Sequence, residues 1–117
     1  MRSLEDRVEL AWLMAFYAGV LTDRQRRVLS LYCEEDLSLS EIAEITGVSR
    51  QNVHETVTRT ADKLYGLETR LHLAERFRLT ERQLVACRAA LEAGETDRAR
   101  QLLDDLIRIH QEDQNGL

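Results

Sequence analysis

The stretch LSEIAEITGVSRQNV, residues 39–53, decides the fold of this chain. Ala43 is small at the point where two steeply crossing helices come closest, and Gly47 supplies the positive φ of a three-residue turn between them. Ser49 can accept hydrogen bonds from the free N–H groups at the start of the second helix. The apolar side chains that hold the two helices together are Ile42, Val48 and Val53. The pattern predicts a helix-turn-helix.

The second helix of such a motif presents its N-terminal side chains to base edges in the major groove of DNA. Four side chains point away from the apolar stripe of this helix: Arg50, Gln51, His54 and Thr58. A fifth polar residue, Ser49, lies directly before the helix. Arginine reads guanine and glutamine reads adenine through paired hydrogen bonds. A serine at the helix start can contact a phosphate. We therefore predict these five residues as the nucleic-acid-binding site.

The charge of the motif leaves a second interpretation open. Residues 38–63 carry three basic side chains against four acidic ones, and the whole chain has a net charge of −5. Phosphate neutralisation supplies much of the affinity of proteins for DNA. The motif could therefore pack helices or bind a protein without reading nucleic acid.

Helical patterns continue on both sides of the motif. Residues 4–18 repeat apolar side chains at helical spacing, with a stripe at Leu4, Val8, Ala11 and Ala15 that is widened by Trp12, Leu13 and Phe16. Capping boxes at residues 22–25, 38–41 and 80–83 predict three helix starts. The helix from Ser49 keeps an apolar stripe past Gly66 and could run to about residue 75, with a break at Gly66 as the alternative. The stripe consists of Val53, Val57, Ala61, Leu64, Leu67 and Leu71. With no proline and only five glycines, the chain is predicted to be all-α.

The domain organisation follows from these helices. Residues 1–66 are predicted as the helix-turn-helix domain, and residues 67–117 as a C-terminal helical extension. The extension contains the end of the long helix and a helical hairpin. The residues of its last helix predicted to face inward are Ala99, Leu102, Leu103, Leu106 and either Ile109 or His110. The apolar stripes of the long and last helices have more surface than a small monomer can bury.

We therefore expect a homodimer formed through residues 64–109.

The chain lacks the parts of an enzyme. Its three histidines, His54, His72 and His110, have no carboxylate and nucleophile at catalytic spacing, and no glycine-rich phosphate loop is present. Cys33 and Cys87 stand far apart, which is typical of small core residues rather than of a zinc site. We expect no catalysis, no metal and no cofactor.

The start of the chain predicts a cytoplasmic protein. Its first residues are charged and form no apolar signal-peptide core. The longest apolar run, residues 11–20, has about half the length that a membrane span needs.

Several short elements in ungapped order carry a family resemblance. They are FYA at 16–18, LTDRQ at 21–25, LY at 31–32, DLSLSEIAE at 36–44, GVSRQ at 47–51, RT at 59–60, KL at 63–64 and LH at 71–72. Together they make residues 12–73 resemble the YlxM family of bacterial proteins. The motif alone also resembles the promoter-binding last domain of sigma factors.

The resemblance implies a cytoplasmic bacterial protein with a sigma-like helix-turn-helix core. The long helix and the C-terminal helical hairpin are predicted from the helical pattern, because the likeness fades beyond Leu73. It also implies a link to the signal recognition particle pathway, known chiefly from gene neighbourhood. Ser49, Arg50 and Gln51 match the family motif directly, and no catalytic residues come with it. Three hypotheses follow. The chain is a regulatory nucleic-acid-binding protein of that pathway, a sequence-specific transcription regulator, or a protein-interaction module. The partners are DNA, or the RNA or protein of the particle.

Overall fold

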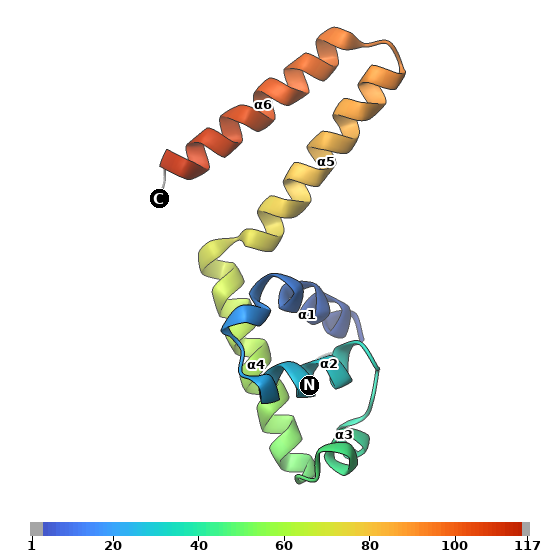
Figure 1. Ribbon diagram of the computed structural model, residues 1–117, viewed down its shortest axis with the longest axis vertical. Helices are drawn as coiled ribbons and strands as arrows, with labels where there is room; N and C mark the ends of the chain where they lie inside the picture. The colour runs from blue at the N-terminus through green and yellow to red at the C-terminus, as the bar shows by residue number, and fades with distance from the viewer. Residues whose placement is uncertain (1–3, 116–117) are drawn as a thin grey trace. The chain divides into compact units, whose positions relative to one another are not determined.

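The computed structural model describes the backbone of residues 4–115 and the side chains of residues 6–112. Within these ranges it contains six α-helices, one short 3₁₀ helix and no strand, which confirms the predicted all-α class (Figure 1). The elements are α1 Leu4–Tyr17, η1 Ala18–Val20, α2 Asp23–Cys33, α3 Leu39–Thr46, α4 Arg50–Leu71, α5 Leu73–Glu92 and α6 Thr96–Asn115. No helix among the described residues is long and apolar enough to cross a membrane.

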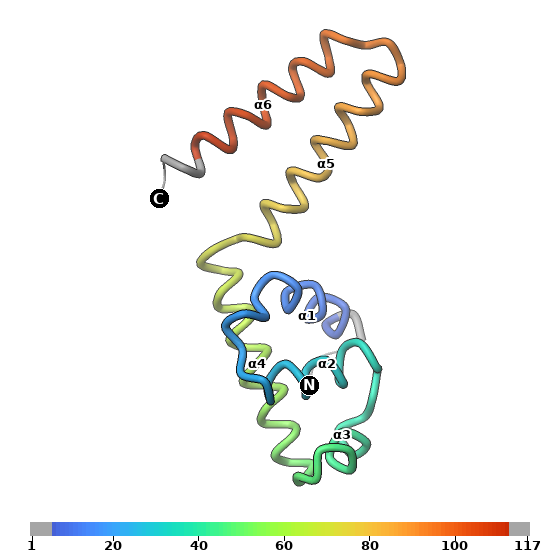
Figure 2. Tube along the Cα trace, in the orientation of Figure 1, coloured from blue at the N-terminus to red at the C-terminus, as the bar shows by residue number. Residues whose placement is uncertain are grey.

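The chain forms two compact units, which divide between Ala74 and Glu75 rather than after residue 66. The reason lies in α4, which continues through Gly66 to Leu71 and ends at His72, whose backbone is left-handed with φ 55°. The whole of α4 therefore belongs to the first unit, and Figure 2 shows it as one continuous helix.

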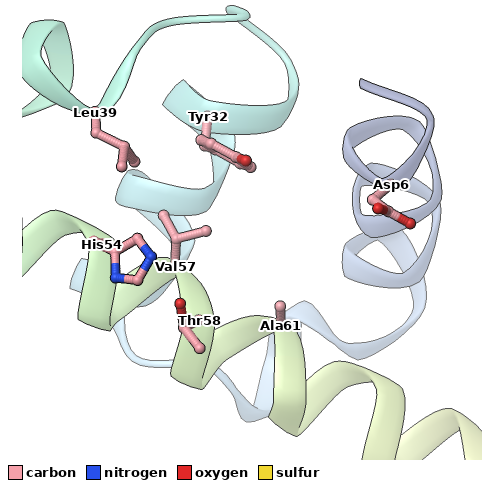
Figure 3. A pocket seen from close by; sticks show the side chains of 7 residues that line it. All are labelled: Asp6, Tyr32, Leu39, His54, Val57, Thr58 and Ala61. Atoms are coloured by element: carbon pink, nitrogen blue, oxygen red, sulfur yellow. The ribbon is translucent and has the colours of Figure 1, made fainter. Parts of the chain in front are cut away.

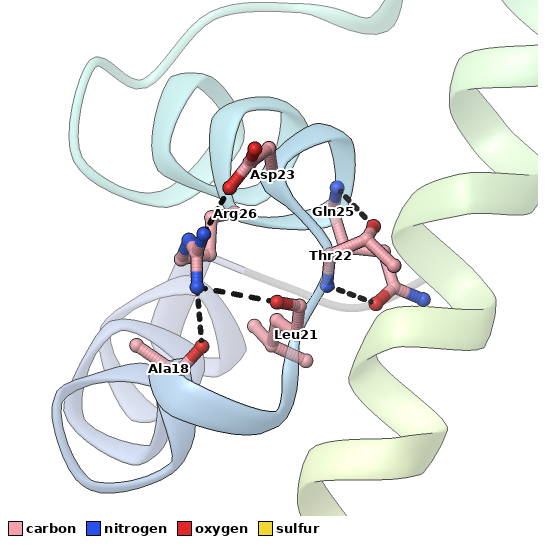
Figure 4. Close-up of polar contacts among 6 residues, drawn as sticks. All are labelled: Ala18, Leu21, Thr22, Asp23, Gln25 and Arg26. Carbon is pink, nitrogen blue, oxygen red and sulfur yellow. Dashed lines mark hydrogen bonds and ion pairs between the residues drawn. The ribbon is translucent and has the colours of Figure 1, made fainter.

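Capping by local side chains starts the first helices as predicted. The Thr22 hydroxyl accepts from the Gln25 N–H at 3.1 Å, and the Gln25 side chain accepts from the Thr22 N–H at 3.0 Å (Figure 4). Ser38 and Glu41 make the same exchange at the start of α3. These boxes satisfy N–H groups that a helix start otherwise leaves without partners.

The third predicted capping box, at Thr80, is wrong, because α5 begins seven residues earlier at Leu73 and runs through that position. A tertiary contact caps α5 instead. The Tyr17 hydroxyl accepts from the Leu73 N–H at 3.2 Å, and a Glu68 carboxylate oxygen accepts from the Ala74 N–H at 3.1 Å. Tyr17 also donates to the same carboxylate oxygen at 2.6 Å.

The core of the first unit lies among α1, α2, α3 and α4. On α4 it takes Val53, Val57, Ala61 and Leu64, as the apolar stripe predicts, whereas Leu71 at the end of that stripe is exposed. On α1 the prediction is right only in part: Leu13 is buried and Trp12 and Phe16 pack against the core, but Val8 is exposed, and the Leu4 side chain lies outside the described ones. The other buried residues of α1 are Leu10, Met14 and Tyr17, whose larger side chains remove more apolar area from water than the stripe through Val8 would.

Thr60 is the buried polar residue of this core, and its hydroxyl has no hydrogen-bond partner among the described residues. A buried polar atom without a partner costs about 1–3 kcal/mol. Thr60→Val keeps the shape and removes the hydroxyl, so we expect it to raise the free energy of unfolding by about 1 kcal/mol. Urea denaturation measures the change. Thr58→Val, at an exposed position of the same helix, should change stability by less than about 0.5 kcal/mol.

The second unit is the hairpin of α5 and α6. Its turn is closed by Gly94 at φ 77° and by a 2.8 Å hydrogen bond from the Glu95 N–H to the Ala90 carbonyl. Among the side chains described up to residue 112, those buried between its helices are the small Cys87, Ala90 and Ala99, with Leu102 packed against them. The predicted inward position of Leu103 is wrong, because this side chain is exposed.

Candidate nucleic-acid interface

The turn between α3 and α4 has the geometry that the sequence predicts. Gly47 adopts φ 74°, in the left-handed region where residues with a side chain are strained. The Ser49 hydroxyl accepts from the Asn52 N–H at 3.0 Å and caps α4. Arg50 and Gln51 follow at the first turn and are exposed. The positive end of the helix dipole and two polar side chains therefore meet the solvent at one place.

His54 and Thr58 lie one and two turns further along α4, on the same side as Arg50, and both are exposed. They also line an open pocket of about 420 Å³, whose floor contains Leu39, Val57 and Ala61 (Figure 3). The pocket is further lined by Asp6 and Tyr32. The structure thus brings all five predicted residues to one exposed side of α4, with two of them at the edge of a hollow.

Helix α2 carries three arginines near the start of α4, but only Arg24 and Arg27 are placed where they could contact nucleic acid. Arg24 donates to the Asn52 side chain on α4, and Arg27 is exposed. Arg26 instead donates to the carbonyls of Ala18 and Leu21 at 3.0 and 3.2 Å and pairs with Asp23 (Figure 4). Arg26 therefore holds the turn before α2 in place.

The contact between Arg24 and Asn52 is the part of this site that sequence reasoning missed. It joins side chains 28 positions apart, so helical periodicity gives no signal for it. Asn52 is the third residue of α4. Its backbone N–H donates to the Ser49 hydroxyl, so its side chain is left to accept from Arg24. The contact fixes Arg24 beside the exposed first turn of α4.

Acidic side chains limit the positive potential of this surface. Glu55 is exposed on α4, four residues after Gln51 and therefore on the same side. Glu41 and Glu44 are exposed on α3. The backbone N–H of Ser38 bonds the Glu41 carboxylate and lowers its pKa, so this group stays ionised at neutral pH. The positive charge is therefore confined to the start of α4 and the adjacent arginines.

The cysteines are placed as core residues. Cys87 is buried in the hairpin, and burial is the main cause that raises the pKa of the Cys33 thiol to about 12. A thiol with such a pKa is protonated at neutral pH and is a poor nucleophile and metal ligand. Across the described side chains, no group of three or more His, Cys, Asp or Glu residues is arranged to hold a metal ion.

Comparison with known proteins agrees with this geometry. Residues 4–108 match the family UPF0122, described as "Putative helix-turn-helix protein, YlxM / p13 like". A UPF0122 protein of Clostridium botulinum (strain Alaska E43 / Type E3) is 40% identical over 82 residues, which cover 70% of this chain and 75% of the relative. A UPF0122 protein of Mycoplasma capricolum is 36% identical over 94 residues, or 80% of each chain. The chain therefore belongs to the UPF0122 family of YlxM-like helix-turn-helix proteins.

Proposed function

We propose that this chain is a cytoplasmic regulatory protein that binds nucleic acid through the start of α4 and acts in the signal recognition particle pathway. The observation that carries the proposal is the exposed, capped first turn of α4, where Arg50 and Gln51 stand free of the core. Side chains at this position of a helix-turn-helix reach base edges when the helix enters a groove.

The surroundings of α4 support a binding role. Arg24 and Arg27 lie on α2 beside the first turn, where arginines can neutralise backbone phosphates. Ser49 accepts a backbone hydrogen bond, and its hydroxyl proton remains able to donate to a phosphate oxygen. His54 and Thr58 extend the polar edge along the helix. Contacts to phosphates would position the protein on the nucleic acid, and contacts to bases would give it a preference for particular sequences.

The association with the particle rests on the YlxM resemblance. A folded RNA presents single-stranded loops and bulges, whose bases are open to arginine stacking and hydrogen bonding. Few positive charges are needed for such local recognition, whereas duplex DNA binding draws on many phosphate contacts. The limited basic surface at α4 therefore favours the RNA of the particle over long duplex DNA as the ligand.

Arg50→Ala tests the role of α4 directly. We expect this variant to bind the particle RNA about 10-fold to 100-fold more weakly, because a specific arginine contact is worth about 1–3 kcal/mol. Fluorescence anisotropy measures the affinity. Arg98→Ala, which removes the same charge from an exposed site on α6, should bind like the unmodified chain. Equal loss in both variants would mean that net charge, and not the first turn of α4, sets the affinity.

The acidic balance of the motif supports a second candidate, a protein-interaction module without nucleic-acid binding. Glu55 is exposed on α4 one turn after Gln51, at the border of the predicted reading side, where a carboxylate repels phosphates. Under this hypothesis Arg50→Ala leaves the function intact, whereas a polar residue at Leu67 or Leu102 abolishes it. A complementation assay with these variants separates the two candidates.

A further inference from the structure

The α5–α6 hairpin buries very little of its own apolar surface. Its two helices have 20 residues each, yet among the described residues the side chains fully buried between them are the small Cys87, Ala90 and Ala99, with Leu102 partly buried against them. Large apolar side chains lie outside this seam. Leu84 and Leu91 on α5 and Leu103 and Ile107 on α6 are 41–56% exposed. A pair of helices needs another layer to bury such surface.

Helix geometry places these four side chains on one side of the hairpin. Leu84 and Leu91 are two turns apart on α5, and Leu103 and Ile107 are one turn apart on α6. Each stripe is rotated by about 100° in the same sense from its helix's side of the seam. Because the hairpin reverses the chain direction, equal rotations bring both stripes to the same side. We call these four residues the apolar face of the hairpin.

We propose that a second copy of this chain covers the apolar face and that the two hairpins form an antiparallel four-helix bundle. A two-fold axis across the helices, near Leu103, sets α5 against α5 and α6 against α6 of the second copy. Every helix then runs antiparallel to its neighbours, which is a common arrangement of such bundles. The same patch serves both copies, as two-fold interfaces require.

The side of the hairpin that carries the apolar face has a size that suits a second copy. A helix of 20 residues is about 30 Å long, and two packed helices present a strip about 20 Å wide. The strip has an area of about 600 Å², close to the roughly 800 Å² that each partner contributes to a stable interface. A second hairpin has the same length and the same exposed side chains, so it covers the whole strip.

Charge also suits a second copy. The exposed charged residues around the apolar face include both signs: Glu81, Arg88, Glu92, Arg100 and Asp104. Two identical copies therefore do not repel each other. With the axis near Leu103, Arg100 of each copy comes within reach of Asp104 of the other at the edge of α6. Because charges of both signs surround the apolar face, this surface is not complementary to a strongly acidic or strongly basic partner.

Sedimentation velocity of the full chain at micromolar concentration tests the proposal. We expect a single species of about twice 13.5 kDa for the unmodified chain. Leu103→Glu with Ile107→Glu should shift it to the monomer mass. Val85→Glu is the matched control: Val85 is exposed to a similar degree but lies on the other side of α5, so this variant should stay dimeric. A monomeric unmodified chain overturns the proposal, and so does a dimeric Leu103→Glu, Ile107→Glu variant.

Charge reversal tests the same interface without placing a carboxylate in an apolar layer. Arg100→Asp alone and Asp104→Arg alone should each weaken the dimer about 3-fold to 10-fold, and the two together should restore it. Circular dichroism checks that each variant keeps its helices. If the double reversal is no better than either single change, or if both single changes leave the dimer intact, the proposed register is wrong.

Discussion

Replacing Ile42 with alanine should lower the free energy of unfolding by about 2–5 kcal/mol, which is the usual cost of removing such a side chain from a close-packed core. Ile42 is fully buried on α3, where the helix packs on α4. The loss combines the apolar area returned to water with the cavity left behind. Urea denaturation followed by circular dichroism measures it.

Ile45 provides the matched control, because it lies three residues later on the same helix and is 51% exposed. Ile45→Ala removes the same atoms, yet we expect a change within about 0.5 kcal/mol. If both variants lost equal stability, the buried side of α3 would not be the one that the structure shows. The comparison therefore tests how the helix-turn-helix packs.

Replacing Arg7 with alanine should cost about 2–3 kcal/mol, because two backbone carbonyls then lose a charged donor. The Arg7 guanidinium donates to the carbonyl of Tyr32 at 2.6 Å and of Leu37 at 3.1 Å. It also stacks on the Tyr32 ring at 3.8 Å and lies 3.7 Å from the Asp36 carboxylate. Arg7 thus joins α1 to the end of α2 and to the segment before α3.

Arg7→Lys is the informative partner variant. A lysine keeps the charge but loses the planar fork that reaches both carbonyls and the stacking on the ring. We expect it to recover only part of the stability lost in Arg7→Ala, as measured by the same denaturation experiment. Full recovery would show that charge alone is sufficient. A cost below about 0.5 kcal/mol for Arg7→Ala would contradict the role given to this residue.

The local parts of the fold could be predicted from the sequence, because each depends on side chains a few residues apart. The capping boxes at Thr22 and Ser38 and the left-handed glycine at Gly47 are of this kind. Thr80 shows the limit. It has the same local pattern, but the chain breaks at His72 and α5 is capped there by Tyr17 and Glu68. Such a contact between distant residues leaves no periodic signal.

Which side of a helix is buried could be predicted only where a single apolar stripe runs along the helix. On α4 the stripe from Val53 to Leu64 has no competitor, and the structure confirms it. On α1 two stripes share the helical period, and packing against α2 and α4 selects the one with larger side chains. The inward position of Leu103 is wrong because Ala99 and Leu102 are the residues that pack against α5, and Leu103 lies about 100° further round α6 than Leu102.

The candidate site was predictable in composition but not in its supporting contacts. The five predicted residues follow from the motif, and the structure shows all of them exposed on α4. The hydrogen bond from Arg24 to Asn52 depends on how α2 crosses α4, and the bonds from Arg26 to the carbonyls of Ala18 and Leu21 depend on how the chain turns before α2. Three neighbouring arginines in the sequence therefore have three different surroundings.

The most direct test of the central proposal is a fluorescence-anisotropy titration of the full chain against the signal recognition particle RNA and against random duplex DNA, each at two salt concentrations. The proposal predicts binding to the RNA that weakens as salt rises, since phosphate contacts release counterions, and much weaker binding to the duplex. Absence of binding to both ligands at the lower salt concentration would contradict it and would assign the helix-turn-helix to protein contacts.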